Sequence, residues 1–116
     1  IAPLGLDKND QTFNINADTV AGSLAKELKA RRLMIISDVE GVLDKEKKLL
    51  PEIDSNKANK LINQNIISGG MIPKINNCLD VASNGVKAVV IIDGRKNHSL
   101  LFELLSDKGS GTLIRK

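Results

Sequence analysis

The sequence has few of the residues that base stacking, metal binding and disulfide formation require. It contains two Phe, no Tyr and no Trp, so it offers almost no aromatic surface on which a single-stranded nucleic acid could stack. The single cysteine, Cys78, excludes an internal disulfide and cannot form a metal cluster by itself. The single histidine, His98, lacks partners at metal-ligand spacing, which argues against a zinc site or a catalytic triad.

Long apolar runs are also absent. No segment approaches the roughly 20 apolar residues that span a bilayer, and the start of the chain lacks the basic and apolar stretches of a signal peptide. The net charge is +3, but the Lys residues alternate with acidic ones, as on a solvated surface. We therefore expect a soluble protein with no membrane or nucleic-acid partner, in the cytoplasm or, for an alga, the plastid stroma. We expect Cys78 in the core.

The apolar content is sufficient for one domain, since 41% of the 116 residues are hydrophobic. Two short β-prone segments, 1–6 and 11–15, flank turn formers at 7–10 and predict a hairpin. Asn16 then offers a side-chain oxygen to cap a helix that ends near Ala30.

Strands and helices alternate along the rest of the chain. Continuous apolar runs predict buried strands at 33–36 and 88–92, helical spacing predicts helices introduced by Pro51 and Asp54, at 71–82 and around 100–105, and a short strand follows at 112–114. This order predicts an α/β fold, a three-layer α/β/α sandwich with an open, mainly parallel sheet. Ligands of such sheets bind at the carboxyl ends of the strands, here Ser37-Asp38 and Asp93-Gly94.

The loop Ser68-Gly69-Gly70 leads directly into a predicted helix that carries Lys74 in its first turn. Free N–H groups at a helix start without bulky side chains suit a phosphate group. The helix dipole disfavours a cation there by about 0.3–1 kcal/mol, which an anionic neighbour would reverse. The loop is not a Walker A sequence, and an exposed Lys on an ordinary glycine-started helix is the alternative.

The segment Asn14-Ile15-Asn16-Ala17-Asp18 places two amides and a carboxylate where a strand enters a helix. Polar groups at such a junction commonly face a ligand cleft. A structural role explains Asn16 as the helix cap and Asp18 as a complement to the dipole, but it leaves Asn14 unexplained. For Asp93-Gly94-Arg95, a simple turn is the alternative.

Taken together, these motifs resemble the acetylglutamate kinases, a branch of the amino-acid kinase family. The resemblance covers essentially the whole chain, and its specificity comes from the order and spacing of several segments. They are Asn14-Ile15-Asn16-Ala17-Asp18 with Thr19-Val20-Ala21-Gly22, Ser37-Asp38-Val39-Glu40-Gly41-Val42-Leu43, Ile67-Ser68-Gly69-Gly70-Met71-Ile72-Pro73-Lys74, and Ile92-Asp93-Gly94-Arg95 with His98 and Gly111-Thr112.

The resemblance implies phosphoryl transfer from ATP to the γ-carboxylate of N-acetyl-L-glutamate, giving N-acetylglutamyl 5-phosphate in arginine biosynthesis. By this resemblance Asn14 holds the amino-acid substrate, Lys74 stabilises the transition state and Asp18 orients the catalytic lysines. Mg²⁺ is expected to arrive bound to ATP. The nucleotide pocket is expected at Ser37, Asp38, Val39, Glu40, Gly41, Val42, Leu43, Ile66, Ile67, Ser68, Gly70 and Met71.

The C-terminal segment resembles the arginine-sensitive enzymes of the family. An arginine effector site is implied at His98, Glu103 and Gly111, where a Glu would pair with the guanidinium group. A homo-oligomer and the PII signalling protein are further implied partners of the full-length enzyme. Residues 1–116 are expected to form the C-terminal, ATP-binding half of the kinase domain. The glycine-rich phosphate loop and the second lysine of the family's N-terminal half find no match, so the chain alone is expected to be inactive.

Two other functions stay open on the sequence. The α/β unit could be a non-catalytic module that senses nucleotide or arginine. It could also belong to a sibling kinase acting on glutamate, carbamate, aspartate or UMP. The Asn14–Asp18 and Ser68–Lys74 motifs favour acetylglutamate over these substrates.

Overall fold

The computed structural model describes residues 1–116 as an open sheet with helices on both faces and a separate hairpin. The strands are β1 (Leu4–Leu6), β2 (Thr12–Asn14), β3 (Arg32–Ser37), β4 (Glu52–Ile53), β5 (Ala88–Asp93) and β6 (Thr112–Ile114). The helices are α1 (Ala17–Glu27), α2 (Ser55–Asn63), α3 (Met71–Ser83) and α4 (Ser99–Leu105). None of these helices has the length and apolar character needed to cross a membrane.

The main sheet has the strand order β3-β5-β6-β4. Strand β3 pairs with β5 in parallel, β4 pairs with β6 in parallel, and only the central β5–β6 pair is antiparallel. The predicted open, mainly parallel sheet is therefore confirmed. The register ends with Ser37 opposite Asp93, so the two predicted strand ends do meet at one edge of the sheet.

Strand β4 is the one element that the sequence pattern did not predict. Its two residues lie between Pro51 and Asp54, and the sequence pattern predicts for this segment only the start of the following helix. Ile53 is fully buried and pairs with Ile114 of β6. Two residues are too few to show an alternating pattern, so this strand depends on a partner more than 50 residues away.

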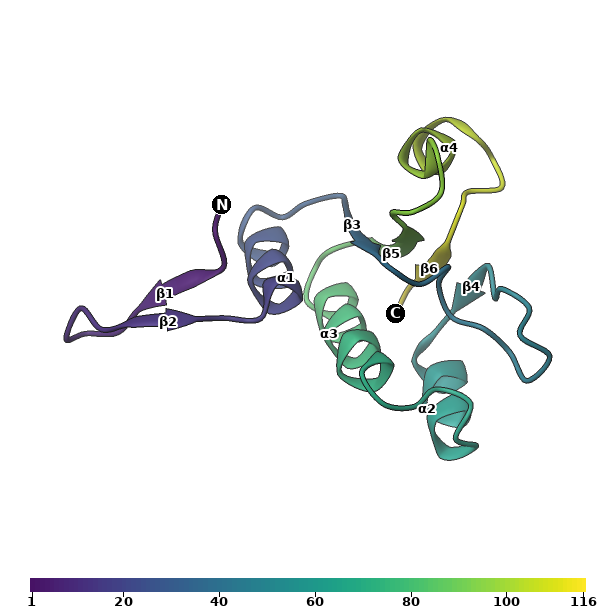
Figure 1. Ribbon diagram of the computed structural model, residues 1–116, viewed down its shortest axis with the longest axis horizontal. Coiled ribbons are helices and arrows are strands. Elements are labelled where there is room, and N and C mark those ends of the chain that lie inside the picture. Colours follow the sequence, from purple (N-terminus) through teal and green to yellow (C-terminus); the bar gives the residue numbers. More distant parts are fainter.

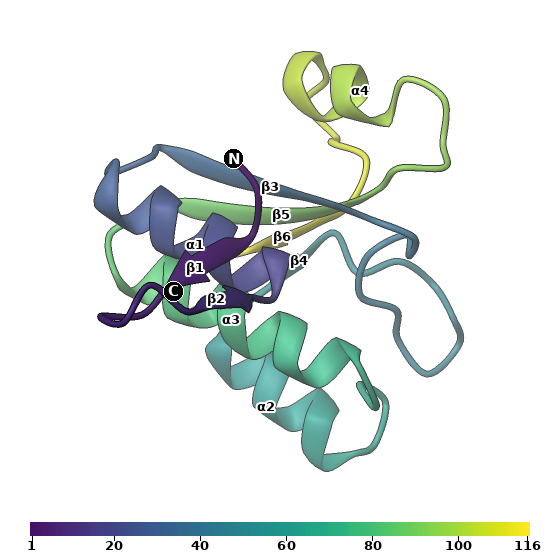
Figure 2. The same ribbon diagram turned by 60° about the vertical axis from the view of Figure 1, so that its left-hand side comes forward.

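The layers are visible in Figures 1 and 2, where α1, α2 and α3 cover one face of the sheet and α4 lies over the other. The core lies between the sheet and the three helices. Strand β5 is its centre, because Val89 through Ile92 are all buried. Cys78 of α3 is fully buried there, which confirms its predicted place in the core. Its burial first, and then the negative charge of Asp18, raise the pKa of the Cys78 thiol to about 12.

The helix α4 and the β1–β2 hairpin leave apolar side chains exposed. The final helix forms as predicted, but its outer surface is open, with Leu101 52% and Leu105 82% exposed. The β1–β2 hairpin extends away from the body of the molecule in Figure 1, and Phe13 on it is 47% exposed. Of the seven residues of α4, only Ser99 is buried.

Candidate functional site

The first part of the site is the start of α1. The amide of Thr19 donates to Asn16 Oδ1 at 3.1 Å, so Asn16 caps the helix as predicted. Asp18 lies in the first turn, where a carboxylate complements the helix dipole. Asn14 ends β2 just before the cap and is exposed. The hairpin therefore brings Asn14 to the same end of α1 as Asp18.

The second part is the start of α3. Gly69 has a φ of +56°, and Gly70 is the N-cap without any side-chain hydrogen bond. Beyond the adjoining backbone, no protein atom lies within 4 Å of the position that a Cβ would take on either glycine. Packing therefore does not explain the absence of side chains at this helix start. The open backbone leaves room for an anion, as the sequence predicts.

A salt bridge joins the two helix starts. Lys74 Nζ lies 2.5 Å from Asp18 Oδ2, and the two side chains are only 20% and 26% exposed. The alternative reading of Lys74 as an ordinary exposed lysine is therefore wrong. Asp18 is the anionic neighbour that offsets the unfavourable position of an ammonium in the first turn of a helix.

Helices α1 and α3 run side by side in the same direction. Near their C-terminal ends Lys26 Nζ lies 2.7 Å from Asp80 Oδ2. At the other end, next to the Lys74–Asp18 pair, the Asn77 side-chain amide donates to the main-chain carbonyl of Asp18 at 2.8 Å. Both helix N-termini therefore meet at the salt bridge, and both contribute positive electrostatic potential there.

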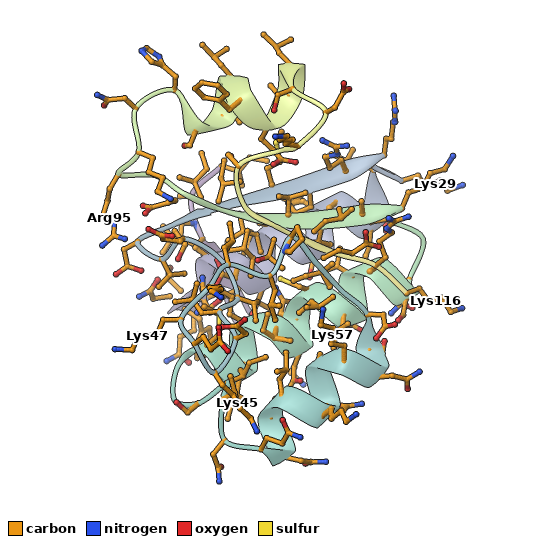
Figure 3. The ribbon with its side chains drawn as sticks, turned by 90° about the vertical axis from the view of Figure 1, so that its right-hand side faces the viewer. Lys29, Lys45, Lys47, Lys57, Arg95 and Lys116 are labelled. Carbon is orange, nitrogen blue, oxygen red and sulfur yellow. The ribbon has the colours of Figure 1, made fainter.

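A cavity of about 600 Å³ opens beside the start of α3. Most of the residues predicted for the nucleotide pocket line it, namely Val39, Glu40, Gly41, Val42, Leu43, Ile66, Ile67, Ser68 and Met71. Of that prediction, Ser37, Asp38 and Gly70 do not line the cavity. Sequence reasoning missed the remaining lining residues, Asp44, Lys45, Lys47, Gln64 and Asn65. Lys45 and Lys47, which are labelled in Figure 3, belong to this lining.

One buried hydroxyl group links the segment 39–50, which supplies one wall of the cavity, to strand β6. Thr112 Oγ1 accepts from the amide of Val42 at 2.8 Å and donates to the carbonyl of Leu50 at 2.7 Å. Gly41 has a φ of +139° and passes so close that a Cβ would lie 2.5 Å from the same Thr112 oxygen. Glycine is therefore required at position 41 both by conformation and by space.

At the carboxyl ends of β3 and β5, the Asp93 carboxylate is bound within its own turn. The Arg95 guanidinium group donates to both carboxylate oxygens at 2.9 Å, and the Arg95 amide donates a third bond at 2.9 Å. These hydrogen bonds lower the pKa of Asp93 to about 2. The structure thus favours the turn interpretation of Asp93-Gly94-Arg95.

A second cavity, of about 330 Å³, lies near the C-terminus. Glu103 and Gly111 line it together with Arg32, Glu52 and Arg115. The Glu103 carboxylate accepts from the Ser110 amide at 2.8 Å and from the Arg32 guanidinium group at 3.4 Å.

His98 lies apart from this second cavity. It lines a separate hollow on α4. It is the residue at the start of that helix and has a left-handed backbone conformation, with a φ of 61°. The structure therefore brings together two of the three residues predicted for an effector site. His98 is the N-cap residue of α4.

The sequence matches a family of known proteins. The model of the Amino acid kinase family matches residues 1–93, which include both helix starts, the Lys74–Asp18 pair and the 600 Å³ cavity. This chain belongs to the amino acid kinase family. It is 87% identical to the acetylglutamate kinase of Pelagibacter ubique over all 116 residues and 54% identical to that of Bradyrhizobium sp. strain ORS 278. The chain spans 40% and 39% of the lengths of these two relatives.

Solved structures agree with the family assignment. The N-acetylglutamate synthase of Neisseria gonorrhoeae, crystallised with coenzyme A and L-arginine, matches all of this amino acid kinase chain with a TM-score of 0.92 and 28% identity. The match covers 27% of that protein. Carbamate kinase of Giardia lamblia, bound to AMP-PNP, matches 97% of the chain over 41% of its own length, with a TM-score of 0.69. At 23% identity, the second likeness concerns the fold alone.

Asn77 also lies near the site, and the sequence motifs did not indicate it. It follows Lys74 by three residues and therefore lies on the same face of α3. A polar side chain on the apolar side of a helix was the available indication, but nothing in the local pattern identifies its partner on α1.

Proposed function

We propose that this chain supplies the ATP-binding part of an acetylglutamate kinase. The reaction is transfer of the γ-phosphoryl group of ATP to the γ-carboxylate of N-acetyl-L-glutamate. The observation that carries the proposal is the 2.5 Å pair of Lys74 and Asp18 at two converging helix starts, beside an open glycine loop. The 87% identity to a named acetylglutamate kinase over the whole chain supports this choice of substrate.

The proposed mechanism rests on positioning and charge. In phosphoryl transfer, negative charge spreads over the transferred group and the leaving oxygen, and the protein has little covalent work to do. In this proposal the Lys74 ammonium group neutralises part of that charge in the transition state. Asp18 holds the ammonium group in place, so little reorganisation is needed during the reaction. Asn14, at the end of β2, is proposed to hold the amino-acid substrate.

The 600 Å³ cavity is proposed to hold the nucleotide. Its volume lies within the range of about 300–1,000 Å³ that is usual for small-molecule sites. Apolar side chains such as Val39, Leu43 and Ile66 would contact the base. The carboxylates of Asp18 and Asp93 are already bound to Lys74 and Arg95, so they do not form a cage for a divalent cation. We propose that Mg²⁺ enters bound to the ATP phosphates.

The test uses a hybrid enzyme, defined as the Pelagibacter ubique acetylglutamate kinase in which these 116 residues replace the matching 40%. We expect ATP-dependent phosphorylation of N-acetyl-L-glutamate, with much lower kcat/KM for glutamate, carbamate, aspartate and UMP. A folded hybrid that binds ATP without phosphorylating any of these would support a nucleotide-sensing module instead. A preference for another acceptor would assign the chain to a sibling kinase.

A second function, binding of arginine as an effector, is favoured by the cavity near the C-terminus. Two ion pairs line it, Arg32–Glu103 at 3.4 Å and Arg115–Glu52 at 2.6 Å. A bound arginine would exchange with these pairs, its guanidinium group contacting a Glu and its carboxylate an Arg. The structural relative with a TM-score of 0.92 was crystallised with L-arginine, which supports the proposal. The homo-oligomer and the PII signalling protein stay predictions from the resemblance.

A further inference from the structure

We propose that Asn77 is a positioning residue for phosphoryl transfer, acting through Asp18 on the ammonium group of Lys74. This inference rests on the proposed function. Asp18 is held from α3 at two points. Lys74 contacts its carboxylate at 2.5 Å, and the Asn77 side-chain amide donates to its main-chain carbonyl at 2.8 Å.

The two contacts differ in what they can fix. A lysine side chain is long and flexible, so its ammonium group can follow a moving carboxylate without fixing the position of either helix. The Asn77 side chain is short and its hydrogen bond to a main-chain carbonyl is directional, so it fixes the backbone of Asp18. When the backbone of Asp18 is fixed, its carboxylate has one preferred position, and so does the Lys74 ammonium group that the carboxylate binds.

Gly22 provides the space for this contact. It lies one turn after Asp18 on α1, and it is buried against α3. A Cβ at position 22 would lie 2.7 Å from Val81 Cγ2 and 3.2 Å from Asn77 Oδ1. Glycine is a poor residue for a helix interior, so its presence here marks a close approach of the two helices. Gly22 lets α1 come close enough for Asn77 to reach Asp18.

The position of Asp18 makes this contact important for catalysis. The first turn of a helix is the part most prone to fray, because its N–H groups lack partners within the helix. Asp18 lies in that turn, and Asn16 caps it from the solvent side through Thr19. A catalytic group displaced by about 1 Å can lose up to a hundredfold in rate. A bond that anchors the first turn of α1 onto α3 thus controls where the Lys74 charge lies.

The experiment compares Asn77→Ala and Asn76→Ala in the hybrid enzyme. Asn76 is the matched control, because it is the same residue type at the neighbouring position and is exposed. We expect Asn77→Ala to lower kcat about tenfold, with KM for ATP and N-acetyl-L-glutamate changed by less than about twofold. Asn76→Ala should leave kcat and KM unchanged. An unchanged kcat in folded Asn77→Ala would overturn the inference.

A double variant separates positioning from general destabilisation. If Asn77 acts through the Lys74 ammonium group, Asn77→Ala should lower kcat by less than about twofold once Lys74 is already Ala. The same tenfold loss in that background would show that Asn77 acts by another route, and would overturn the inference.

Hydrogen exchange in the hybrid provides a readout that does not need activity. Asn77→Ala should speed amide exchange in the first turns of α1 about tenfold, because one anchoring hydrogen bond is lost. Asn76→Ala should not change it. If the unsubstituted hybrid were inactive, the proposed function would fail, and unchanged exchange in Asn77→Ala would separately overturn the anchoring of Asp18.

Discussion

Replacement of Lys74 by Ala separates the structural from the catalytic role of its salt bridge. The structural cost is small. Both side chains are about a quarter exposed or less, so water reaches Asp18 when the ammonium group is removed. Partly exposed pairs contribute about 0–1 kcal/mol. Asp18 also stays favourable at the start of α1 through the helix dipole. We therefore expect the melting temperature of the hybrid enzyme to change by less than about 4 °C.

The catalytic cost is expected to be much larger. An ammonium group about 4 Å from a charged phosphoryl oxygen is worth about 4 kcal/mol at an effective dielectric constant of 20. Removing one preorganised group that stabilises transition-state charge typically costs about 2.7–4 kcal/mol, or a factor of about 10²–10³ in kcat. Because this charge develops during transfer, kcat should fall far more than KM rises. Lys74→Ala is therefore expected to raise the activation free energy of the reaction by several kcal/mol more than it lowers the free energy of unfolding.

The assay measures kcat and KM for ATP and N-acetyl-L-glutamate in the hybrid enzyme, with thermal unfolding in parallel. Lys26→Ala is the matched control, because Lys26 also joins α1 to α3, through Asp80 at 2.7 Å, but at the opposite end of the helices. We expect Lys26→Ala to keep kcat within about twofold of the unsubstituted hybrid. If Lys74→Ala also kept its kcat, or if both variants lost activity equally, the role proposed for Lys74 would be refuted.

Three further predictions concern single side chains. Because the pKa of Asp93 is lowered to about 2 from 3.8, its contribution to stability is complete above pH 4 and is lost as the pH falls from 4 to 2; Asp93→Asn should flatten urea-unfolding midpoints over that range. The buried Cys78, with its pKa raised to about 12, should resist iodoacetamide until the protein unfolds, and labelling of the native protein would contradict this. Glu103→Gln should weaken binding of L-arginine to the hybrid about tenfold or more by calorimetry, whereas the exposed Glu46→Gln should not; equal affinities would reject the effector site.

Much of the local structure could be predicted from short-range patterns. The cap at Asn16, the glycine-started helix that bears Lys74 and the buried strand at 88–92 all follow from spacing within a few residues. Because each depends on neighbours in the chain, the sequence was sufficient. The motifs also indicated the family, which the match over residues 1–93 confirmed. The burial of Cys78 could also be predicted, because apolar residues at helical spacing placed it on the apolar face of its helix.

Contacts between distant segments could not be obtained in this way. Asp44, Lys45 and Lys47 line the cavity on a segment that Thr112 links to β6, and no local pattern in the sequence connects that segment with position 112. His98 and Glu103 are only five residues apart, but the left-handed turn and short helix direct them into different cavities. A small change in backbone direction thus decided which residues could share a ligand.

The sequence by itself determined every element except β4, the family, and the residue types that could carry charge to a phosphate. The resemblance implied that Asp18 orients the catalytic lysines, but only the tertiary structure placed Lys74 against Asp18, 56 residues away, and Asn77 against the backbone of the same residue. The physical reason is that secondary structure depends on hydrogen bonds and side-chain spacing within a turn or two. The distance between two helices depends instead on packing, here on the absence of a side chain at Gly22.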